Sequence, residues 1–451
     1  MLEILAVDTP SLGDRGYLAT DGDVALVVDA QRDFDRVLGL ADKRGVGITH
    51  VFETHVHNDY VTGGFALAQA TGAQYLVNCK EPVAFDRTAI EDGDEIDVGR
   101  MRVQVIGTPG HTFTHLSYAI ADRDSCAAFT GGSLLNGTTG RTDLLGRENA
   151  EALSHAQFNS AHRLARALPS PTAIYPTHGF GSFCAASPAT SESSTISEEI
   201  RVNPALRQNE AEFVHDLLAG LDAYPGYYAH MGPANLAGPA APELATPSRA
   251  DPEELRRRIN AGEWVVDLRS RTAFAGGHMR GSLNFELGEN LATYLGWLIP
   301  WGAPLTLVGD SAADVAEAQR ELCRIGIDTI DSAASGPVAD WAAGEQLESF
   351  RTADFATLAT KAGNGALLVL DVRGDREWHD AHVESALHIP LHELADRMDE
   401  IGGGEVWVHC HYGYCASVAA SILSARGRSV VAIDDDFESA RAAGLAPAAA
   451  S

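Results

Sequence analysis

Four histidines lie in segments whose residue types are typical of metal ligands. His55 and His57 alternate at the end of an apolar run, and Asp59 follows two residues after the second imidazole. His111 lies in the run Thr-Pro-Gly-His-Thr and His178 in Tyr-Pro-Thr-His-Gly, where Pro and Gly mark turns that would hold both rings at strand ends. A single histidine is more often a packed residue than a ligand. Imidazole and carboxylate are metal ligands, however, and four such histidines together predict a composite metal site.

A second site is predicted around Cys410. The apolar residues 406–409 predict a buried strand that delivers Cys410 to a loop, and Cys415 stands just before the helix-like run 416–426. Loop amides and a helix N-terminus direct their positive ends at such a sulfur, which lowers the pKa of the thiol and favours the thiolate. A cysteine at a strand end is usually a buried apolar residue, but this loop context predicts a nucleophile that attacks sulfane sulfur.

These residues must be positioned by more than one domain, because 451 residues predict two to four domains of ordinary size. Short strands dominate the first part of the chain, and residues 58–70 are predicted to be helical. The Pro-rich stretch 237–252 predicts an interdomain linker. Beyond it one sequence motif occurs twice, as Trp-Val-Val-Asp-Leu-Arg at 264–269 and Leu-Val-Leu-Asp-Val-Arg at 368–373. This repeat predicts two related α/β domains with parallel sheets. We therefore predict domains at 1–238, 250–350 and 351–451.

The composition disfavours several classes of partner. Sixty-two acidic residues stand against 33 basic ones, and a formal net charge of -29 without a Lys/Arg-rich run disfavours nucleic acid and anionic membranes. The longest apolar runs are strand-sized, and the first residues lack the basic and apolar regions of a secretory signal, so we expect no membrane partner and a cytoplasmic location. Six scattered cysteines indicate thiol chemistry rather than a disulfide framework.

The histidine motifs, in this order, resemble the metallo-β-lactamase fold, and Gly-Arg-Thr-Asp-Leu at 140–144 resembles its persulfide dioxygenase branch. The resemblance implies an α/β fold, a four-layer αββα sandwich. It implies His55, His57 and His111 around a first metal position. Asp59 and His178 would then lie at a second position or behind the first. It further implies one Fe(II) per chain, held by two histidines and one aspartate, with zinc as the alternative.

Three further positions bear on this resemblance. Arg141 would bind the carboxylate of a low-molecular-weight thiol, or else form a structural ion pair. Gly132 stands where the family carries its aspartate, and Tyr60 stands where many relatives have another histidine. Because a bridging carboxylate is missing, a dinuclear hydrolase is disfavoured. Two interpretations remain: a mononuclear metal centre held by three imidazoles, or a former metal site that no longer binds metal.

The segment around Cys410 resembles the active loop of rhodanese sulfurtransferases, in which a cysteine takes up sulfur as a persulfide and passes it to a thiol. The family commonly has arginine at the sixth loop position, where this chain has Cys415. Cys415 is therefore a candidate resolving thiol that forms a reversible disulfide with Cys410 or accepts sulfur from it, and a packing role is the alternative. The first repeat has Asp310 in place of the cysteine, so residues 250–350 are predicted to be a rhodanese-like scaffold, a docking domain or a dimer contact.

Together the two resemblances imply an enzyme of sulfur metabolism. The leading hypothesis is oxidation of a low-molecular-weight persulfide to sulfite and thiol in the metal domain, with a rhodanese site that handles sulfane sulfur from a persulfide or thiosulfate. A non-oxidising sulfane-sulfur carrier or sensor with a degenerate metal site is the second hypothesis. A thioester hydrolase similar to glyoxalase II is the third. The chain could also act as a homo-oligomer.

Overall fold

The short β-branched runs of the first part of the chain form two six-stranded sheets in the computed structural model, which describes residues 2–122, 125–362 and 367–447. The first sheet has the order β1-β2-β3-β4-β5-β6. Its strands are β1 (Glu3–Thr9), β2 (Asp14–Thr20), β3 (Val24–Val28), β4 (Gly47–Phe52), β5 (Gln74–Asn78) and β6 (Thr88–Ile90). The second sheet has the order β12-β11-β10-β9-β8-β7. It consists of β7 (Glu95–Val98), β8 (Met101–Gly107), β9 (Leu116–Asp122), β10 (Ser125–Gly131), β11 (Ala173–Pro176) and β12 (Ser194–Thr195).

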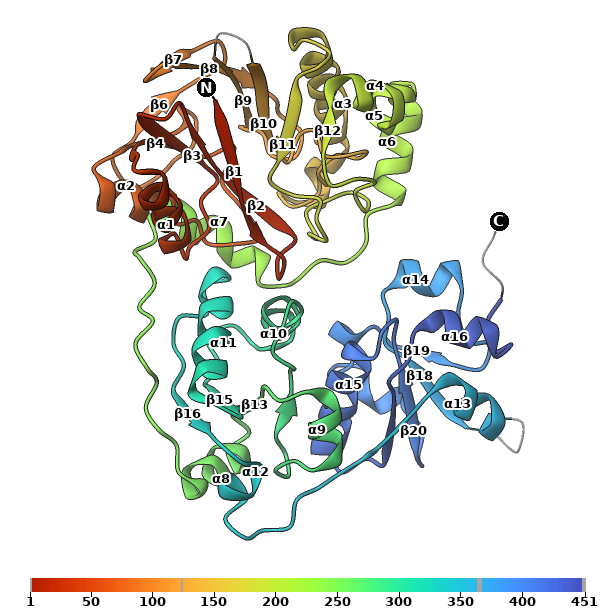
Figure 1. Ribbon diagram of the computed structural model, residues 1–451. Coiled ribbons are helices and arrows are strands. Elements are labelled where there is room, and N and C mark those ends of the chain that lie inside the picture. Colours follow the sequence, from red (N-terminus) through yellow and green to blue (C-terminus); the bar gives the residue numbers. More distant parts are fainter. Residues whose placement is uncertain (1, 123–124, 363–366, 448–451) are drawn as a thin grey trace. The chain divides into compact units, whose positions relative to one another are not determined.

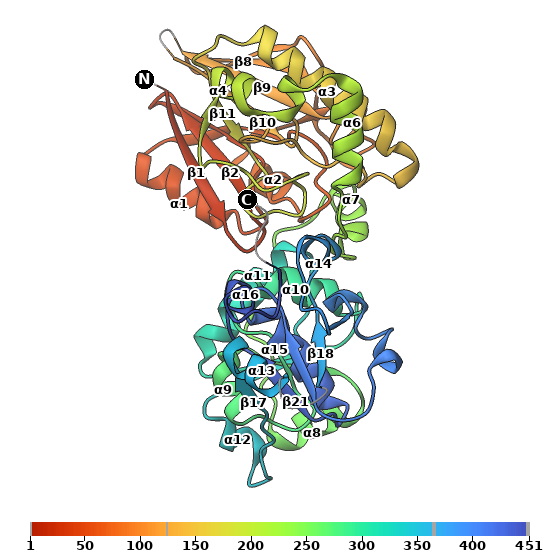
Figure 2. The same cartoon turned by 90° about the vertical axis from the view of Figure 1, so that its right-hand side faces the viewer.

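Helices cover the outer face of each sheet. The first sheet is covered by α1 (Asp35–Arg44) and α2 (Gly64–Thr71). The second is covered by α3 (Ala150–Ala167), α4 (Ile196–Val202), α5 (Pro204–Arg207) and α6 (Glu210–Ala219), and Figure 2 looks onto the side of α3 and α6. A short 3-10 helix (Arg147–Asn149) precedes α3, and α7 (Tyr228–Ala237) follows α6.

Figure 1 shows these layers, and three apolar cores hold them together. One fills the space between the two sheets, with Phe52, Tyr118 and Phe129 among its buried residues. A second joins α1 and α2 to the first sheet, and a third joins α3 and α6 to the second sheet. Three cores between four layers confirm the predicted αββα sandwich. None of the helices in the described ranges is both long and apolar enough to cross a membrane.

The helix predicted over residues 58–70 begins only at Gly64, so this prediction was wrong for its first turn and a half. The reason lies in a side chain far along the sequence. Asn235 on α7 donates to the carbonyl oxygens of His57 and Tyr60 at 2.9 Å each, and its own side-chain oxygen accepts from the amide of Thr62 at 2.9 Å. Because these backbone groups are satisfied by Asn235, the segment stays a loop that presents Asp59 and Tyr60 to the interior.

The chain divides into two compact units, Met1–Glu243 with Cys323–Gly326, and Leu244–Leu322 with Ile327–Ser451. The second unit contains two parallel sheets, with the orders β14-β13-β15-β16 and β17-β21-β20-β18-β19. Its first half comprises α8 (Pro252–Asn260), β13 (Trp264–Asp267), α9 (Arg271–Gly276), β14 (Leu283–Asn284), α10 (Leu291–Leu298), β15 (Leu305–Gly309), α11 (Ala312–Arg324, except its last two residues), β16 (Ser332–Ser335) and α12 (Val338–Ala342). Its second half comprises β17 (Arg351–Ala353), α13 (Phe355–Ala362), β18 (Leu368–Asp371), α14 (Asp375–Asp380), β19 (Leu387–His388), β20 (Val406–His409), α15 (Tyr414–Ala425), β21 (Val430–Ile433) and α16 (Phe437–Ala442), with 3-10 turns at Leu391–Glu393 and Met398–Glu400.

The repeated sequence motif corresponds to a repeated strand order in the two halves of the second unit. In each half the first four strands of the common pattern lie in the same spatial order, second-first-third-fourth, and β17 is an addition at the edge of the second sheet. The arginine of each motif forms an ion pair with the aspartate two residues before it. The guanidinium nitrogen and the carboxylate oxygen are 2.6 Å apart both in Arg269–Asp267 and in Arg373–Asp371. The two halves therefore share both topology and a buried ion pair. Because they lie within one compact unit, the division at 350 into separate domains stays a prediction.

Candidate functional site

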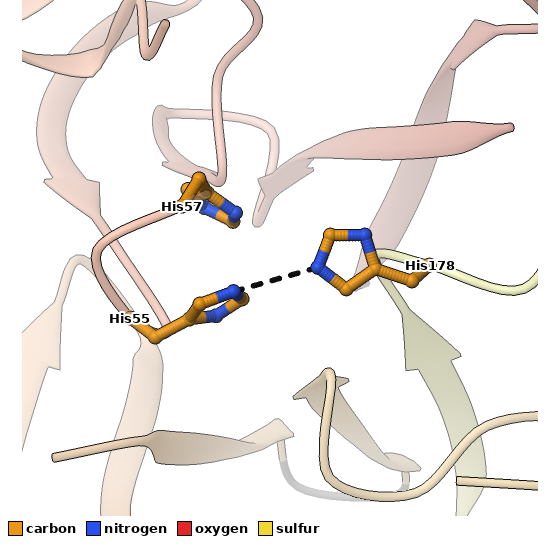
Figure 3. Close-up of side chains that lie close together, drawn as sticks. All are labelled: His55, His57 and His178. Carbon is orange, nitrogen blue, oxygen red and sulfur yellow. Dashed lines mark hydrogen bonds between the residues drawn. The ribbon is translucent and has the colours of Figure 1, made fainter. Parts of the chain in front are cut away.

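The histidines that the sequence singles out converge where loops leave the two sheets of the first unit. His55 and His57 lie on the loop after β4, His111 follows β8, and His178 follows β11. Figure 3 shows the rings of His55, His57 and His178 turned toward one another from their loops. The Nε2 atoms of His55 and His178, 123 residues apart in sequence, are 3.4 Å apart, and all four rings are buried. The fold therefore assembles the imidazole cluster that the sequence predicts.

Hydrogen bonds on the outer side of the cluster orient two of these rings. Nδ1 of His111 lies 2.7 Å from the carbonyl oxygen of Arg141, and Nδ1 of His178 lies 2.8 Å from a carboxylate oxygen of Asp14. A carbonyl only accepts, so Nδ1 of His111 donates its proton. The raised pKa of His178 makes Nδ1 of His178 the donor to Asp14. Nε2 of His111, which has no hydrogen-bond partner among the described residues, then presents a lone pair to the cluster. Metal-binding histidines are oriented by such outer hydrogen bonds.

The charges around His178 favour a cation at the centre of the cluster. Burial lowers the pKa of His178, but the carboxylates of Asp59 and Asp14 outweigh it and raise that pKa well above its ordinary value. Burial and the neighbouring imidazoles lower the pKa of His55 well below its ordinary value, so His55 is neutral. A proton on Nε2 of His178 therefore faces the lone pair of His55, and a metal ion bound there would replace that proton.

His57 is oriented by a different pair of carboxylates. Its Nε2 lies 3.2 Å from oxygens of both Asp29 and Glu53, and 2.9 Å from the hydroxyl of Tyr60, the residue that replaces a family histidine. Burial lowers the pKa of His57, but the charge and hydrogen bond of Asp29, together with Glu53, raise it to about 9. Only Nδ1 is left without a partner in the part of the chain that the structure describes. His57 can therefore reach a metal only through that nitrogen.

The glycine at position 132 is required by the way His111 packs. A side chain at Gly132 would overlap the imidazole of His111. The amide of Gly132 donates to Nε2 of His115 at 3.0 Å, and Nδ1 of His115 lies 2.8 Å from the hydroxyl oxygen of Thr108. The aspartate that the persulfide dioxygenase resemblance implies therefore has no room here unless His111 moves.

Four buried groups in the described ranges have donor atoms within 4.8 Å of one another. They are His55 with His57 and His178; His111 with His178 and Cys184; Asp14 with Asp59 and His178; and Asp29 with Glu53 and His57. The fold thus carries a metal-binding type of cluster, and His178 belongs to three of the four groups. None of these groups combines two imidazoles with one carboxylate, so the donor set does not fit the iron arrangement that the resemblance implies.

Sequence reasoning missed five residues of this cluster: Asp14, Asp29, Glu53, His115 and Cys184. Four of the five carried a signal, and Asp14 carried none. Asp29 and Glu53 directly follow apolar strands, and His115 and Cys184 follow His111 and His178 by a few residues. Asp29 also adopts a φ of 52°, which is uncommon for a residue other than glycine.

Arg141 lies within this unit but its guanidinium is already paired. It binds Asp143 through two nitrogens at 2.7 and 2.9 Å and also donates to the carbonyl oxygens of Phe183 and Asp222. The residue is buried. The structure thus presents Arg141 as the structural ion pair that the sequence left as its alternative role, and its role as an anion contact stays a prediction.

The second candidate site lies in the second half of the second unit. Cys410 directly follows β20, and its sulfur accepts hydrogen bonds from the amides of Gly413 at 3.1 Å and Ala416 at 3.3 Å, at the start of α15. Gly413 has a φ of 89°, a conformation that favours glycine and that lets the loop curl around the sulfur. Burial raises the pKa of Cys410, but the thiol of Cys415 and these amides donate to the sulfur and lower it.

Cys415 is held between the two halves of this unit. Its thiol hydrogen-bonds the sulfur of Cys410, which together with burial raises the pKa of Cys415 well above its ordinary value. The hydroxyl of Tyr294, on α10 of the first half, hydrogen-bonds Cys415. Ser417 on α15 donates to Asn284 of the first half at 3.0 Å. The half that carries Asp310 therefore supports the loop of the half that carries the cysteines.

Comparison with known proteins agrees with this architecture. Residues 16–178 match the family model of the metallo-beta-lactamase superfamily, and residues 354–443 match that of the rhodanese-like domain. The curated relatives include the mitochondrial persulfide dioxygenase ETHE1 of Bos taurus, 31% identical over 45% of this chain and 72% of that protein. They also include the hydroxyacylglutathione hydrolase of Rhizobium johnstonii, 37% identical over 32% of this chain and about half, 53%, of that protein. A solved metallo-beta-lactamase structure from Staphylococcus aureus is 26% identical and superposes with a TM-score of 0.66, over 74% of this chain and 99% of its own.

Proposed function

Because the chain belongs to the metallo-β-lactamase superfamily and carries a rhodanese-like domain, we propose that it is an enzyme of sulfur metabolism that moves sulfane sulfur through Cys410. The observation that carries this proposal is the pair of amides, from Gly413 and Ala416, that donate to the Cys410 sulfur. They stabilise a thiolate, and they would stabilise the terminal sulfur of a persulfide in the same loop.

The transfer has two steps. The thiolate of Cys410 attacks the outer sulfur of thiosulfate or of a low-molecular-weight persulfide, a new S–S bond forms on Cys410, and sulfite or a thiolate leaves with the electron pair of the broken S–S bond. An acceptor thiolate then attacks the outer sulfur of the Cys410 persulfide. This second attack gives the acceptor persulfide and restores the Cys410 thiolate.

Cys415 offers a second reaction by which the sulfur bound to Cys410 can be released. As a thiolate it would attack the inner sulfur of the Cys410 persulfide, so that a Cys410–Cys415 disulfide forms and hydrosulfide leaves. A dithiol reductant would then be needed to regenerate both thiols. The hydrogen bond between the two side chains supports this role, since it places Cys415 beside the sulfur it would attack.

Mass spectrometry of the full-length protein tests the proposal. Treatment of the reduced protein with thiosulfate should add one sulfur to the peptide that contains Cys410, and C410S should take up none. Cys323, buried in α11, should remain unmodified and serves as the matched control. Sulfur on Cys323 with none on Cys410 would overturn the assignment of the nucleophile.

Persulfide oxidation in the first unit is the second candidate function. The buried imidazole cluster supports it, as does the similarity to proteins named persulfide dioxygenase. This function would require Fe(II), because zinc has no redox chemistry; zinc, the alternative metal, would suit hydrolysis or a binding role. Oxygen uptake and sulfite formation from a low-molecular-weight persulfide, measured in the metal-loaded C410S variant, would support it. No oxygen uptake would leave a sulfane-sulfur carrier, and hydrolysis of an acylglutathione would favour the hydroxyacylglutathione hydrolase relatives instead.

A further inference from the structure

Cys184 lies against the histidine cluster, in a loop that the metal motifs of the sequence do not include. Its sulfur, one ring nitrogen of His111 and one of His178 belong to a group whose donor atoms all lie within 4.8 Å of one another, and all three residues are buried. The loop is fixed by backbone hydrogen bonds. The amide of Arg141 donates to the carbonyl oxygen of Cys184 at 2.8 Å, and the carbonyl oxygen of Arg141 accepts from His111. One backbone residue thus positions both the sulfur and the imidazole.

One of the donor nitrogens of this group lacks a partner, whereas Cys184 hydrogen-bonds Asp59. Nε2 of His111 is buried without a hydrogen-bond partner among the residues that the structure describes. Burying such an atom unpaired costs free energy, and a buried polar cluster of this kind is stable when every member is satisfied. Nδ1 of His178 is held by Asp14, which leaves Nε2 of that ring to face the cluster. A metal ion would contact both nitrogens and the sulfur at once and would give Nε2 of His111 the partner that it lacks.

Cys184 can supply a negative charge to a bound cation, as the missing aspartate would have done. Gly132 cannot carry a carboxylate beside the present His111 ring. Burial, Asp59 and Asp14 raise the pKa of Cys184 well above its ordinary value, so Cys184 is a thiol that becomes a thiolate ligand only when a cation displaces its proton. Imidazole and thiolate ligands bind zinc and copper, while two imidazoles and one carboxylate are typical of non-haem iron. The donor set therefore favours a thiophilic cation.

We propose that His111, His178 and Cys184 bind one divalent cation of the zinc class through two imidazole nitrogens and a thiolate sulfur. Nε2 of His55 borders the remaining coordination position, 3.4 Å from Nε2 of His178. Binding displaces the proton of the Cys184 thiol to solvent, so no oxidant or reductant is needed. The site does not depend on sulfur transfer at Cys410, since its residues belong to the other unit.

Cobalt(II) in place of zinc tests the thiolate ligand, because a cobalt–thiolate bond gives a near-ultraviolet charge-transfer band that nitrogen and oxygen ligands do not. Cobalt is added to the full-length protein in the C410S/C415S background, so that the thiols of the second unit do not contribute. We expect the band in this background, its loss when C184S is added, and its retention when C126S is added as the matched cysteine control. A band of equal intensity in the C184S protein would overturn the proposal.

X-ray absorption of the zinc-loaded protein decides the question without a change at Cys184. In the C410S/C415S background we expect one sulfur at about 2.3 Å and nitrogen neighbours at about 2.0 Å from the metal. A coordination sphere of nitrogen and oxygen alone would overturn the assignment. The sulfur-transfer assay at Cys410, run on the C184S protein, gives an independent result, because loss of the metal ligand should leave that reaction at the wild-type rate.

Discussion

The two candidate sites of this chain are built in opposite ways. The cysteine site is local: Cys410, the amides that bind its sulfur and Cys415 all lie within seven consecutive residues, 410–416. The histidine site is assembled from loops of both sheets, and three of its four rings are oriented by residues from elsewhere in the sequence: Asp14 for His178, Arg141 for His111 and Asp29 for His57. A local site keeps its geometry when its own loop is kept. A site assembled from several loops can replace one metal ligand by another from a different loop. In our proposal, Cys184 replaces the carboxylate that is missing at position 132.

The two halves of the second unit show the same contrast within one fold. Both have the same strand order and the same Asp–Arg pair, yet the loop after β15 carries Asp310 where the loop after β20 carries Cys410. The first half instead contributes Tyr294 and Asn284 to its neighbour. The fold therefore supplies the scaffold, and a few loop residues decide which half has the chemistry.

The largest effect is expected for Cys410→Ser, which breaks the local site. The hydroxyl cannot hold sulfane sulfur as a persulfide, so sulfur transfer from thiosulfate to a thiol should fall by about 10³-fold or more. Metal content should not change, because the histidine cluster belongs to the other unit. Transfer assays and metal analysis on the same preparation check both expectations. Retained transfer would assign the nucleophile elsewhere.

His178→Ala removes the residue of the histidine site that belongs to the largest number of donor groups. His178 belongs to three of the four donor groups, so its loss should weaken metal binding by more than about 100-fold. His57→Ala should cost less, because Nε2 of His57 is committed to Asp29 and Glu53. His155→Ala, an exposed histidine paired with Glu210 at 2.7 Å, is the control and should have no effect. Competition with a chromophoric chelator gives the affinities, and equal losses for His57 and His178 would contradict this ranking.

The contrast between the sites also explains what the sequence could predict. The loop of Cys410 could be predicted almost completely, because strand, loop and helix are read from one short segment. The exception is Tyr294, whose contact with Cys415 depends on packing between two halves of the unit. The four-layer sandwich and the repeated parallel sheets were predicted and are confirmed.

For the histidine site the sequence indicated the residue types but not the contacts. The four histidines were predicted to converge, and they do. Which nitrogen each ring presents depends on Asp14, Asp29 and the carbonyl of Arg141, none of which follows from the spacing of the motifs. The loop before α2 was mispredicted for a related reason, since Asn235 satisfies its backbone from 173 or more residues away.

Gly132→Asp tests whether the histidine site can be returned to the arrangement that the resemblance implies. The new side chain would overlap His111, so overpacking should destabilise the unit by about 1–3 kcal/mol and displace a ring of the proposed metal group. We expect a lower melting temperature and metal binding weakened by about tenfold. Gly132→Ala is the matched control for the steric part alone. Tighter iron binding by the aspartate variant would show instead that the His111 ring moves aside easily and that the new carboxylate binds the metal.

The smallest effect is expected for Cys415→Ala, which changes the local site without removing its nucleophile. The thiol of Cys415 donates to the Cys410 sulfur and, with the amides, lowers the pKa of Cys410. Removing this donor raises that pKa, so less thiolate is present at neutral pH and transfer to an external thiol should fall by a few-fold. The pH–rate profile should shift to higher pH, and the rates should converge where Cys410 is fully ionised. Cys415→Ser keeps a donor and should shift the profile less. Hydrosulfide release with a dithiol should be lost in both variants, since neither can form the disulfide, and release at the wild-type rate would assign Cys415 a packing role.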